Sequence, residues 1–202
     1  MIHYAKGPHQ FVGAWDISGE SETADKLSEI INESVSVAKT LYKTEVYAIV
    51  SDNASNMKKM GRSVSLWHST CSSHTANLLA KDVVDKDINK QIVSVLKEFK
   101  NVDLETFLLK EGGTKVVLPI DVRWCSYRNS YVSFIKNLPF MKRVSCDHSE
   151  KIKPAIQALL FDSEFCTKAT ELIELFDPIC TLINQCQKSE TSIADAVDLW
   201  LN

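Results

Sequence analysis

Residues 46–57, VYAIVSDNASNM, run from apolar and β-branched residues directly into an acid and two amides. This pattern predicts a short buried strand with Asp52 at its carboxyl end. A carboxylate in that position could hold a hard cation such as Mg²⁺ or Mn²⁺, and Asp16, which also follows a strand-like run, is the nearest candidate for a second acid. The plainer interpretation is that Asp52 and Asn53 cap the helix that follows.

Cys71 and His74 form a C-x-x-H pair, which is half of a typical zinc site. His68 or the group at 146–148, Cys-Asp-His, would have to complete the ligand set. A structural zinc site usually has two recognisable ligand pairs, so the spacing disfavours zinc. The favoured interpretation is a small buried cysteine beside a hydrogen-bonded histidine at the first turn of a helix.

Arg123 and Trp124 follow a connector that contains Pro119. Such a tryptophan is usually a core anchor, but beside an arginine it could stack on an unpaired base while the guanidinium contacts phosphate. Local basic character comes from two groups of residues: Lys58, Lys59 and Arg62, and Lys136, Lys142, Arg143, Lys151 and Lys153. Charge runs of this size are usually solvated faces, and we expect that here.

The composition fits a packed globular chain. Of its 202 residues 45% are hydrophobic, and the formal net charge is −3, which argues against a surface that binds polyanions everywhere. We see no secretory leader and no apolar run approaching the roughly 18 residues that cross a bilayer. We therefore expect an intracellular protein with reduced thiols, since its cysteines show no regular short spacing: 71, 125, 146, 166, 180 and 186.

Up to about residue 88 the pattern alternates between strands and helices. Strands are expected at 10–17, 46–50 and about 64–69, each followed by a helix, of which the first is capped by Ser21 or Thr23 and the second ends near Gly61. This alternation is typical of an α/β layer with parallel strands. We therefore assign residues 1–88 to an α/β part.

From residue 89 to 202 the pattern becomes all-α. After a periodic stretch and an extended connector at 115–124, helices are expected at about 125–138, 150–161, 163–187 and 190–201. Pro178 should kink or split the third of these. Both chain ends stop abruptly within element-like patterns, so we expect a fragment of a longer protein.

The motifs SDNASNM, CSSHTANLLAKD and DVRWCSY, in this order, resemble those of the hAT superfamily of DNA transposases and their domesticated relatives. The lead-in at 7–33 looks like a domain of unknown function that precedes the D-N-A-x-N motif in many such proteins. The resemblance covers about residues 7–145. It implies an RNase H-like core interrupted by a helical insertion, metal-dependent cleavage and transfer of DNA strands, and a nuclear location.

Position by position, the resemblance makes Asp52 the second of three catalytic acids and a ligand of Mg²⁺ or Mn²⁺. Asn53 and Asn56 belong to the same motif. Cys71 and His74 match a C-x-x-H motif that shapes the region around the active site. Arg123 and Trp124 match an R-W motif whose tryptophan is implicated in stabilising a flipped base. The family's first and third acids are expected outside this chain.

The resemblance thus implies a partial RNase H-like core at 1–88 and a truncated helical insertion at 89–202, in a protein that is catalytically inactive as this chain. We expect no bound cofactor, weak or absent DNA binding and no membrane contact. With the sheet's central strand missing, the isolated chain should fold poorly or pair its strands differently. Alternatives are a non-catalytic nuclear interaction or regulatory module, with a protein partner or self-association, and, less favoured, a zinc-stabilised binding domain.

Overall fold

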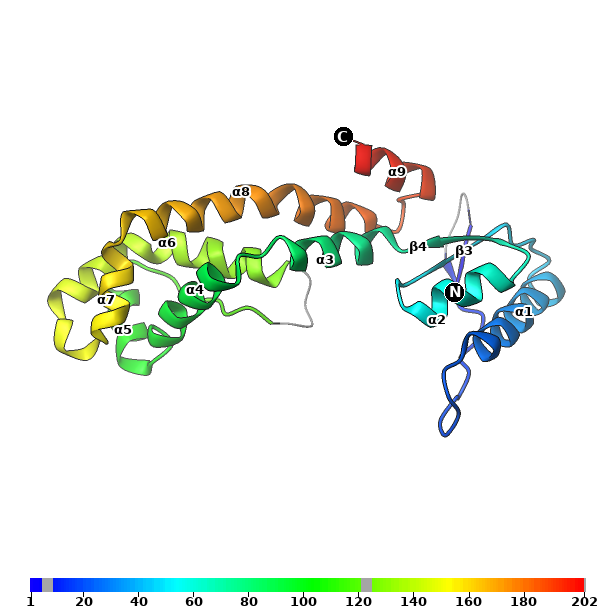
Figure 1. Cartoon of the computed structure of the whole chain (residues 1–202), viewed down its shortest axis with the longest axis horizontal. Helices are drawn as coiled ribbons and strands as arrows, with labels where there is room; N and C mark the ends of the chain where they lie inside the picture. The colour runs from blue at the N-terminus through cyan, green and yellow to red at the C-terminus, as the bar shows by residue number, and fades with distance from the viewer. Residues whose placement is uncertain (5–8, 121–124, 202) are drawn as a thin grey trace. The chain divides into compact units, whose positions relative to one another are not determined.

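The computed structural model describes residues 1–4, 9–120 and 125–201 (Figure 1). They form two compact units: one comprises Met1–Thr75 with Lys188–Asn202, and the other comprises Ala76–Gln187. The described chain is mostly helical, with two small two-stranded sheets. The division into a core at 1–88 and an insertion at 89–202 stays a prediction. Within the described residues, no helix combines the length and apolarity that crossing a bilayer requires.

The first unit is built on a parallel strand pair. Its regular elements are β1 (Ile2–His3), β2 (His9–Gln10), α1 (Ala24–Leu41), β3 (Ala48–Ser51), α2 (Ser55–Ser63), β4 (Trp67–Thr70), the start of α3 (Ser72–Asp82), and α9 (Ile193–Leu201). Strands β3 and β4 pair in parallel, from Ala48 opposite Trp67 to Ser51 opposite Thr70. The parallel arrangement predicted for these two strands is confirmed.

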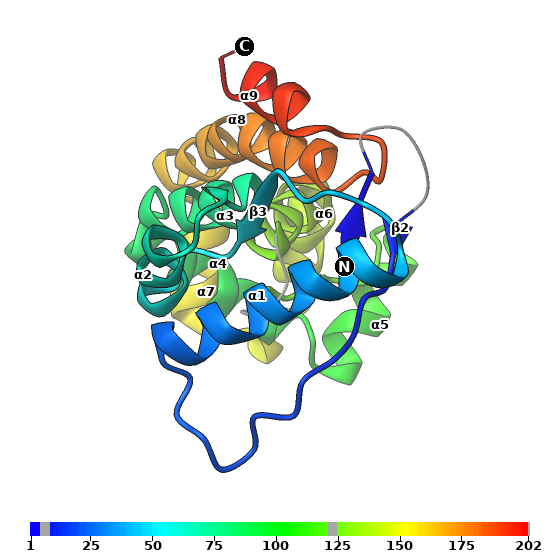
Figure 2. The ribbon, with the colours of Figure 1, turned by 90° about the vertical axis from the view of Figure 1, so that its right-hand side faces the viewer.

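Helices α1 and α2 supply the small core of this unit. Thr23 Oγ1 accepts from Lys26 N at 3.2 Å, which confirms Thr23 as one of the two predicted caps of α1. The core consists of residues at helical spacing on the facing sides of α1 and α2, with Val64 just beyond: Ala24, Leu27, Ile31, Met57, Met60 and Val64. Figure 2 shows α1 from its side.

The strand predicted at 10–17 is wrong, because only Gln10 lies in a strand. The backbone of this run finds other partners: Tyr42 Oη donates to the Phe11 carbonyl at 3.2 Å. Trp15 Nε1 donates to the Glu33 carboxylate on α1 at 2.8 Å. Strand propensity alone does not create a ladder, and no neighbouring strand pairs with residues 11–17 in the described chain.

Two further local predictions need correction. The strand ending before Asp52 is not buried, since no residue of β3 is fully covered and Val50 is 52% exposed. A sheet with only two strands leaves apolar side chains uncovered. Helix α2 does not end near Gly61 but continues to Ser63.

The second unit is an all-helical bundle, as the change of pattern predicts. It contains the remainder of α3, then α4 (Lys86–Glu98), α5 (Val102–Lys110), α6 (Ser126–Asp147), the 3₁₀ turn η1 (Ser149–Lys151), α7 (Pro154–Phe161) and α8 (Ser163–Cys186). Helix α6 packs against α4, α5, α7 and α8, and Figure 1 shows α8 running along it. Fully buried side chains of this unit include Ile92, Leu96, Phe99, Leu108, Tyr131, Phe134, Met141, Leu160, Phe176 and Ile183.

Prolines do not divide the long helices of this unit. Helix α6, expected to end near 138, continues through Pro139 to Asp147, because its buried face continues with Met141 and Val144. Helix α8 is continuous across Pro178, which therefore does not split it. Pro178 lies on the exposed side, where water can satisfy the Glu174 carbonyl that lacks its helical partner.

A polar stripe on α6 holds the extended connector. Asn137 Oδ1 accepts from Thr114 N at 2.7 Å, and Ser133 Oγ accepts from Val117 N at 2.9 Å. Ser126 Oγ donates to the Ile120 carbonyl at 2.7 Å. These three α6 side chains thus serve the connector backbone in place of a strand partner, and residues 115–120 form neither helix nor strand.

Candidate functional site

Asp52 directly follows β3 at the end where the two parallel strands finish. Its side chain is exposed, and Oδ1 accepts from the Ala54 N–H at 2.9 Å. Asp52 therefore closes a local turn between β3 and α2. The prediction that Asp52 and Asn53 cap α2 is wrong, because the cap residue is Ala54 and no side chain caps this helix.

Asn53 connects the end of β3 to the first turn of α3. Its Nδ2 donates to Thr75 Oγ1 at 3.1 Å, while the Thr75 hydroxyl lies 3.1 Å from the Cys71 carbonyl that it can donate to. The Cys71 N–H in turn donates to the Ser51 carbonyl at 2.6 Å. These contacts hold the two strand ends together beside Asp52.

Asn56 has a different role within the same motif. Its Nδ2 donates to the Glu22 carbonyl at 3.0 Å, just ahead of α1, and its Oδ1 accepts from Met57 N at 2.9 Å. Asn56 therefore fixes α2 against the segment that leads into α1.

Cys71 and His74 lie at the junction of β4 and α3, as predicted, and both are half-buried rather than buried. His68 shares a hydrogen bond with Ser51, with 2.9 Å between Nε2 and Oγ. The ring also lies so close to Gly61 that a Cβ there would overlap it. His68 thus packs between β3 and α2.

The other residues that a zinc site would need, at 146–148, lie at the end of α6. Cys146 is exposed, and the His148 ring stacks on Phe107 with 3.9 Å between ring centroids. Within the ranges that the structure describes, no three His, Cys, Asp or Glu side chains are grouped so that they could hold a metal ion.

The surroundings of Asp52 do not fit a complete magnesium or manganese site. Such ions take several oxygen ligands, and Asp52 offers one carboxylate, of which Oδ1 already accepts from Ala54. Asp16 makes an equivalent turn, with Oδ1 accepting from Ser18 N at 2.9 Å. The hydrogen bonds from Ser18 lower the pKa of the Asp16 carboxyl.

Arg123 and Trp124 lie outside the described residues, so their predicted contact with DNA stays a prediction. The adjoining described residue is Cys125, which precedes α6 with a left-handed backbone at φ 58°.

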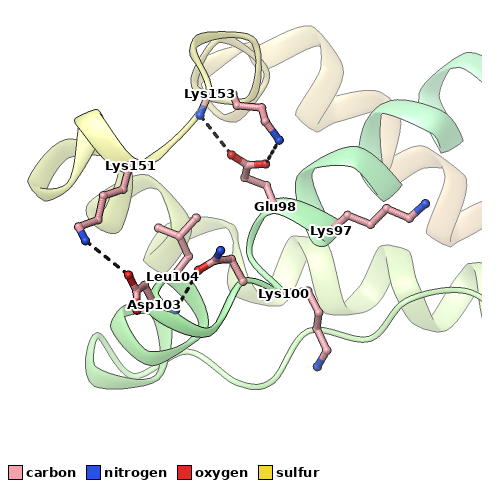
Figure 3. Close-up of a pocket in the computed structure, with 8 residues that line it drawn as sticks. Lys97, Glu98, Lys100, Asp103, Leu104, Lys151 and Lys153 are labelled. Atoms are coloured by element: carbon pink, nitrogen blue, oxygen red, sulfur yellow. Dashed lines mark hydrogen bonds and ion pairs between the residues drawn. The ribbon is translucent and has the colours of Figure 1, made fainter.

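Lys151 and Lys153, two of the basic residues noted in the sequence, line a pocket of about 640 Å³ in the helical unit (Figure 3). Lys153 donates to the Glu98 carboxylate through Nζ at 2.6 Å and through its backbone N at 3.3 Å. Lys151 Nζ lies 3.5 Å from Asp103 Oδ2. Both lysines are thus engaged by acids of the helical unit, which agrees with a solvated, charge-balanced face.

The sequence does not predict the Asn53–Thr75 and Ser51–His68 contacts. Gly61, a glycine inside a helical pattern, is a local signal that α2 closely approaches a neighbour, which is the His68 ring.

In comparisons with known proteins, no family model and no curated protein matches this chain.

Proposed function

We propose that this chain derives from a hAT-type DNA transposase, that Asp52 occupies the position of an ancestral metal ligand, and that the chain by itself does not cleave DNA. The order of the three motifs supports this origin. The observation that carries the proposal is the location of Asp52, exposed at the carboxyl end of a strand paired in parallel with β4. Functional side chains of α/β layers gather at that edge.

The proposed inactivity follows from the chemistry of phosphoryl transfer. Two-metal cleavage needs several carboxylates to hold ions that stabilise both the attacking and the leaving oxygen. In this chain only Asp52 matches an acid of the family's motifs. In this proposal the intact ancestor used Mg²⁺ or Mn²⁺ and acted on DNA in the nucleus, whereas this chain keeps at most weak DNA contact, through Arg123 and Trp124.

A nicking assay tests the proposal. The purified chain and Asp52→Asn are incubated with supercoiled plasmid and either Mg²⁺ or Mn²⁺, and nicked circles are quantified by gel. We expect both proteins to match the protein-free control. Metal-dependent nicking by the wild-type chain that Asp52→Asn abolishes would overturn the proposal, while equal nicking by both identifies a contaminating nuclease.

A second candidate function is a non-catalytic interaction module that works through self-association. Apolar side chains on and beside the small parallel sheet are exposed: Tyr47 is 79%, Val50 52% and Trp67 57% exposed. Strand pairs with uncovered apolar side chains and open edges tend to associate. These exposed apolar side chains therefore favour a module that self-associates over a remnant without a binding surface.

Sedimentation equilibrium over a range of concentrations tests the second candidate. We expect a concentration-dependent dimer that Val50→Lys weakens, because a charge on a sheet opposes association. Val102→Lys is the matched control, since Val102 is a 79% exposed valine at the start of α5 in the helical unit. A monomer at every concentration would eliminate self-association.

A further inference from the structure

Helices α6 and α8 meet through a regular series of contacts in the helical unit. Arg128 Nε lies 2.6 Å from Asp177 Oδ1, and Tyr131 packs edge-on against Phe176 with 5.8 Å between ring centroids. Farther along α6, Phe134 lies near Phe165, with 5.4 Å between centroids. As the residue number rises along α6 it falls along α8, so the two helices run antiparallel.

Cys125 and Cys180 are the next pair in this series. Cys125 lies one helical turn before Arg128, and Cys180 lies one turn after Asp177. Residues three apart share a helix face, so the Arg128–Asp177 ion pair brings the two cysteines opposite each other. Besides burial, the neighbouring Cys125 thiol also raises the pKa of the Cys180 thiol. Cys180 is buried and Cys125 is half-buried.

The local backbone gives no reason for a cysteine at position 125. It stands at the N-cap of α6, where Ser, Thr, Asp or Asn is preferred, and its side chain makes no capping hydrogen bond. Its φ of 58° is a conformation that non-glycine residues rarely adopt. The position of Cys125 opposite Cys180 accounts for a cysteine here.

We propose that Cys125 and Cys180 form a reversible disulfide that ties the beginning of α6 to α8 when the chain meets a small-molecule disulfide such as oxidised glutathione. This is a modification site in the helical unit, separate from the region around Asp52. It does not rest on the transposase origin. How firmly the beginning of α6 is held against α8 would then depend on whether the two thiols are reduced or oxidised.

The exchange has two steps. The Cys125 thiol, the more accessible of the pair, loses its proton, attacks one sulfur of oxidised glutathione and releases one glutathione thiolate. Cys180 then loses its proton and attacks Cys125 Sγ, which releases the second. The two protons end on the two glutathione thiols, the protein pair is oxidised and one glutathione disulfide is reduced.

The surroundings assign Cys180 to the second step. Burial, followed by the neighbouring Cys125 thiol, raises the pKa of the Cys180 thiol, so Cys180 is a poor first nucleophile toward oxidised glutathione. The Arg128 guanidinium acts in the opposite direction and favours a thiolate. Asp177, which engages Arg128, raises the pKa further.

The test uses the full chain, reduced and then incubated with oxidised glutathione. Free thiols are blocked with N-ethylmaleimide, and the digest is mapped by mass spectrometry without reduction. We expect a peptide pair linked through Cys125 and Cys180, reversed by dithiothreitol. We also expect the oxidised chain to melt about 5–10 °C higher, since the bridge closes a long loop.

Cys125→Ser and Cys180→Ala should each remove both the linked peptide and the rise in melting temperature. Cys146→Ser, at an exposed cysteine of α6, is the matched control and should change neither. Separate blocking of Cys125 and Cys180 after oxidation in the wild-type chain would overturn the proposal. So would stable glutathione adducts on Cys125 without a link, and neither result depends on a variant that must fold.

Discussion

The side-chain amide of Asn53 donates to Thr75 Oγ1 across 3.1 Å and so joins the segment after β3 to the first turn of α3. Asn53 is the neighbour of Asp52, and Thr75 follows His74, so the contact links two stretches of sequence that each carry a motif. It positions the Asp52 turn relative to the end of β4. The segment's conformation therefore depends on a contact between residues 22 positions apart.

Asn53→Ala removes this link. We expect it to lower the free energy of unfolding of the first unit by about 1 kcal/mol, the typical net value of one hydrogen bond, and to speed amide exchange at Thr75. Urea titration and hydrogen exchange measure the two effects. Ser55→Ala, at an exposed position of α2, is the control. Equal stability and exchange in Asn53→Ala and Ser55→Ala would show that the link is not formed in solution.

Gly61→Ala should destabilise α2 against β4, although alanine favours helices. A Cβ at 61 would overlap the His68 ring, and overpacking of this kind costs about 1–3 kcal/mol. In the His68→Ala background the overlap is gone, so the same change should be neutral or stabilising by up to about 1 kcal/mol. Thermal melts of the double-mutant cycle measure this reversal of sign. The same cost in both backgrounds would contradict the packing.

Ser133→Ala and Ser130→Ala form a matched pair in α6. Both serines are buried, but Ser133 Oγ accepts from Val117 N in the connector, whereas Ser130 Oγ donates to Tyr127 O within its own helix. We expect Ser133→Ala to cost about 1 kcal/mol and to abolish the exchange protection of Val117, with little effect from Ser130→Ala. Unchanged exchange protection of Val117 in Ser133→Ala would show that Ser133 does not hold the connector through the Val117 N–H.

The sequence predicts the elements whose signals are local. Thr23 caps a periodic run that becomes α1, and the strand-helix alternation from 46 to 70 yields the parallel pair β3–β4. The strand predicted at 10–17 fails because strands need partners, and the choice of partner is non-local. The connector is predicted from Pro119, but the stripe that holds it is not. Ser126, Ser133 and Asn137 recur at roughly helical spacing, and nothing local shows that they bond the connector backbone.

The candidate site is predictable in outline only. The position of Asp52 after a strand and of Cys71 and His74 at a strand-helix junction follows from neighbouring residues. The hydrogen bonds from Asn53 to Thr75 and between His68 and Ser51 depend on how the chain packs, which sequence spacing does not show. The burial of β3 was mispredicted because an apolar run shows what could be covered, and not whether a neighbour covers it.

Tyr131 predicts a pH dependence of stability in the helical unit. Burial raises the pKa of its phenol, whose Oη donates to Asn89 Oδ1 at 3.0 Å. Above the ordinary tyrosine pKa of about 10 the unfolded chain releases this proton while the folded chain keeps it, so stability falls as pH rises, by up to about 1.4 kcal/mol per pH unit.

Urea titrations of the wild-type chain and Tyr131→Phe at pH 8 to 11 measure this effect. The variant loses the hydrogen bond at every pH, but its decline above about pH 10 should be shallower than that of the wild type. Parallel declines would show that the phenol titrates equally in both states.

We propose that Asp52 occupies the position of a metal ligand without a complete site around it. The most direct test is a Mn²⁺ titration followed by paramagnetic broadening of amide resonances, with Asp16 as internal control because its carboxylate makes the same turn. We predict broadening at residues 52–54 comparable to that at residues 16–18, without saturation below about 1 mM Mn²⁺, because each site offers one carboxylate and one carboxylate binds weakly. Asp52→Asn should abolish the broadening at residues 52–54 and leave that at residues 16–18. Saturable micromolar binding at Asp52 would contradict the proposal.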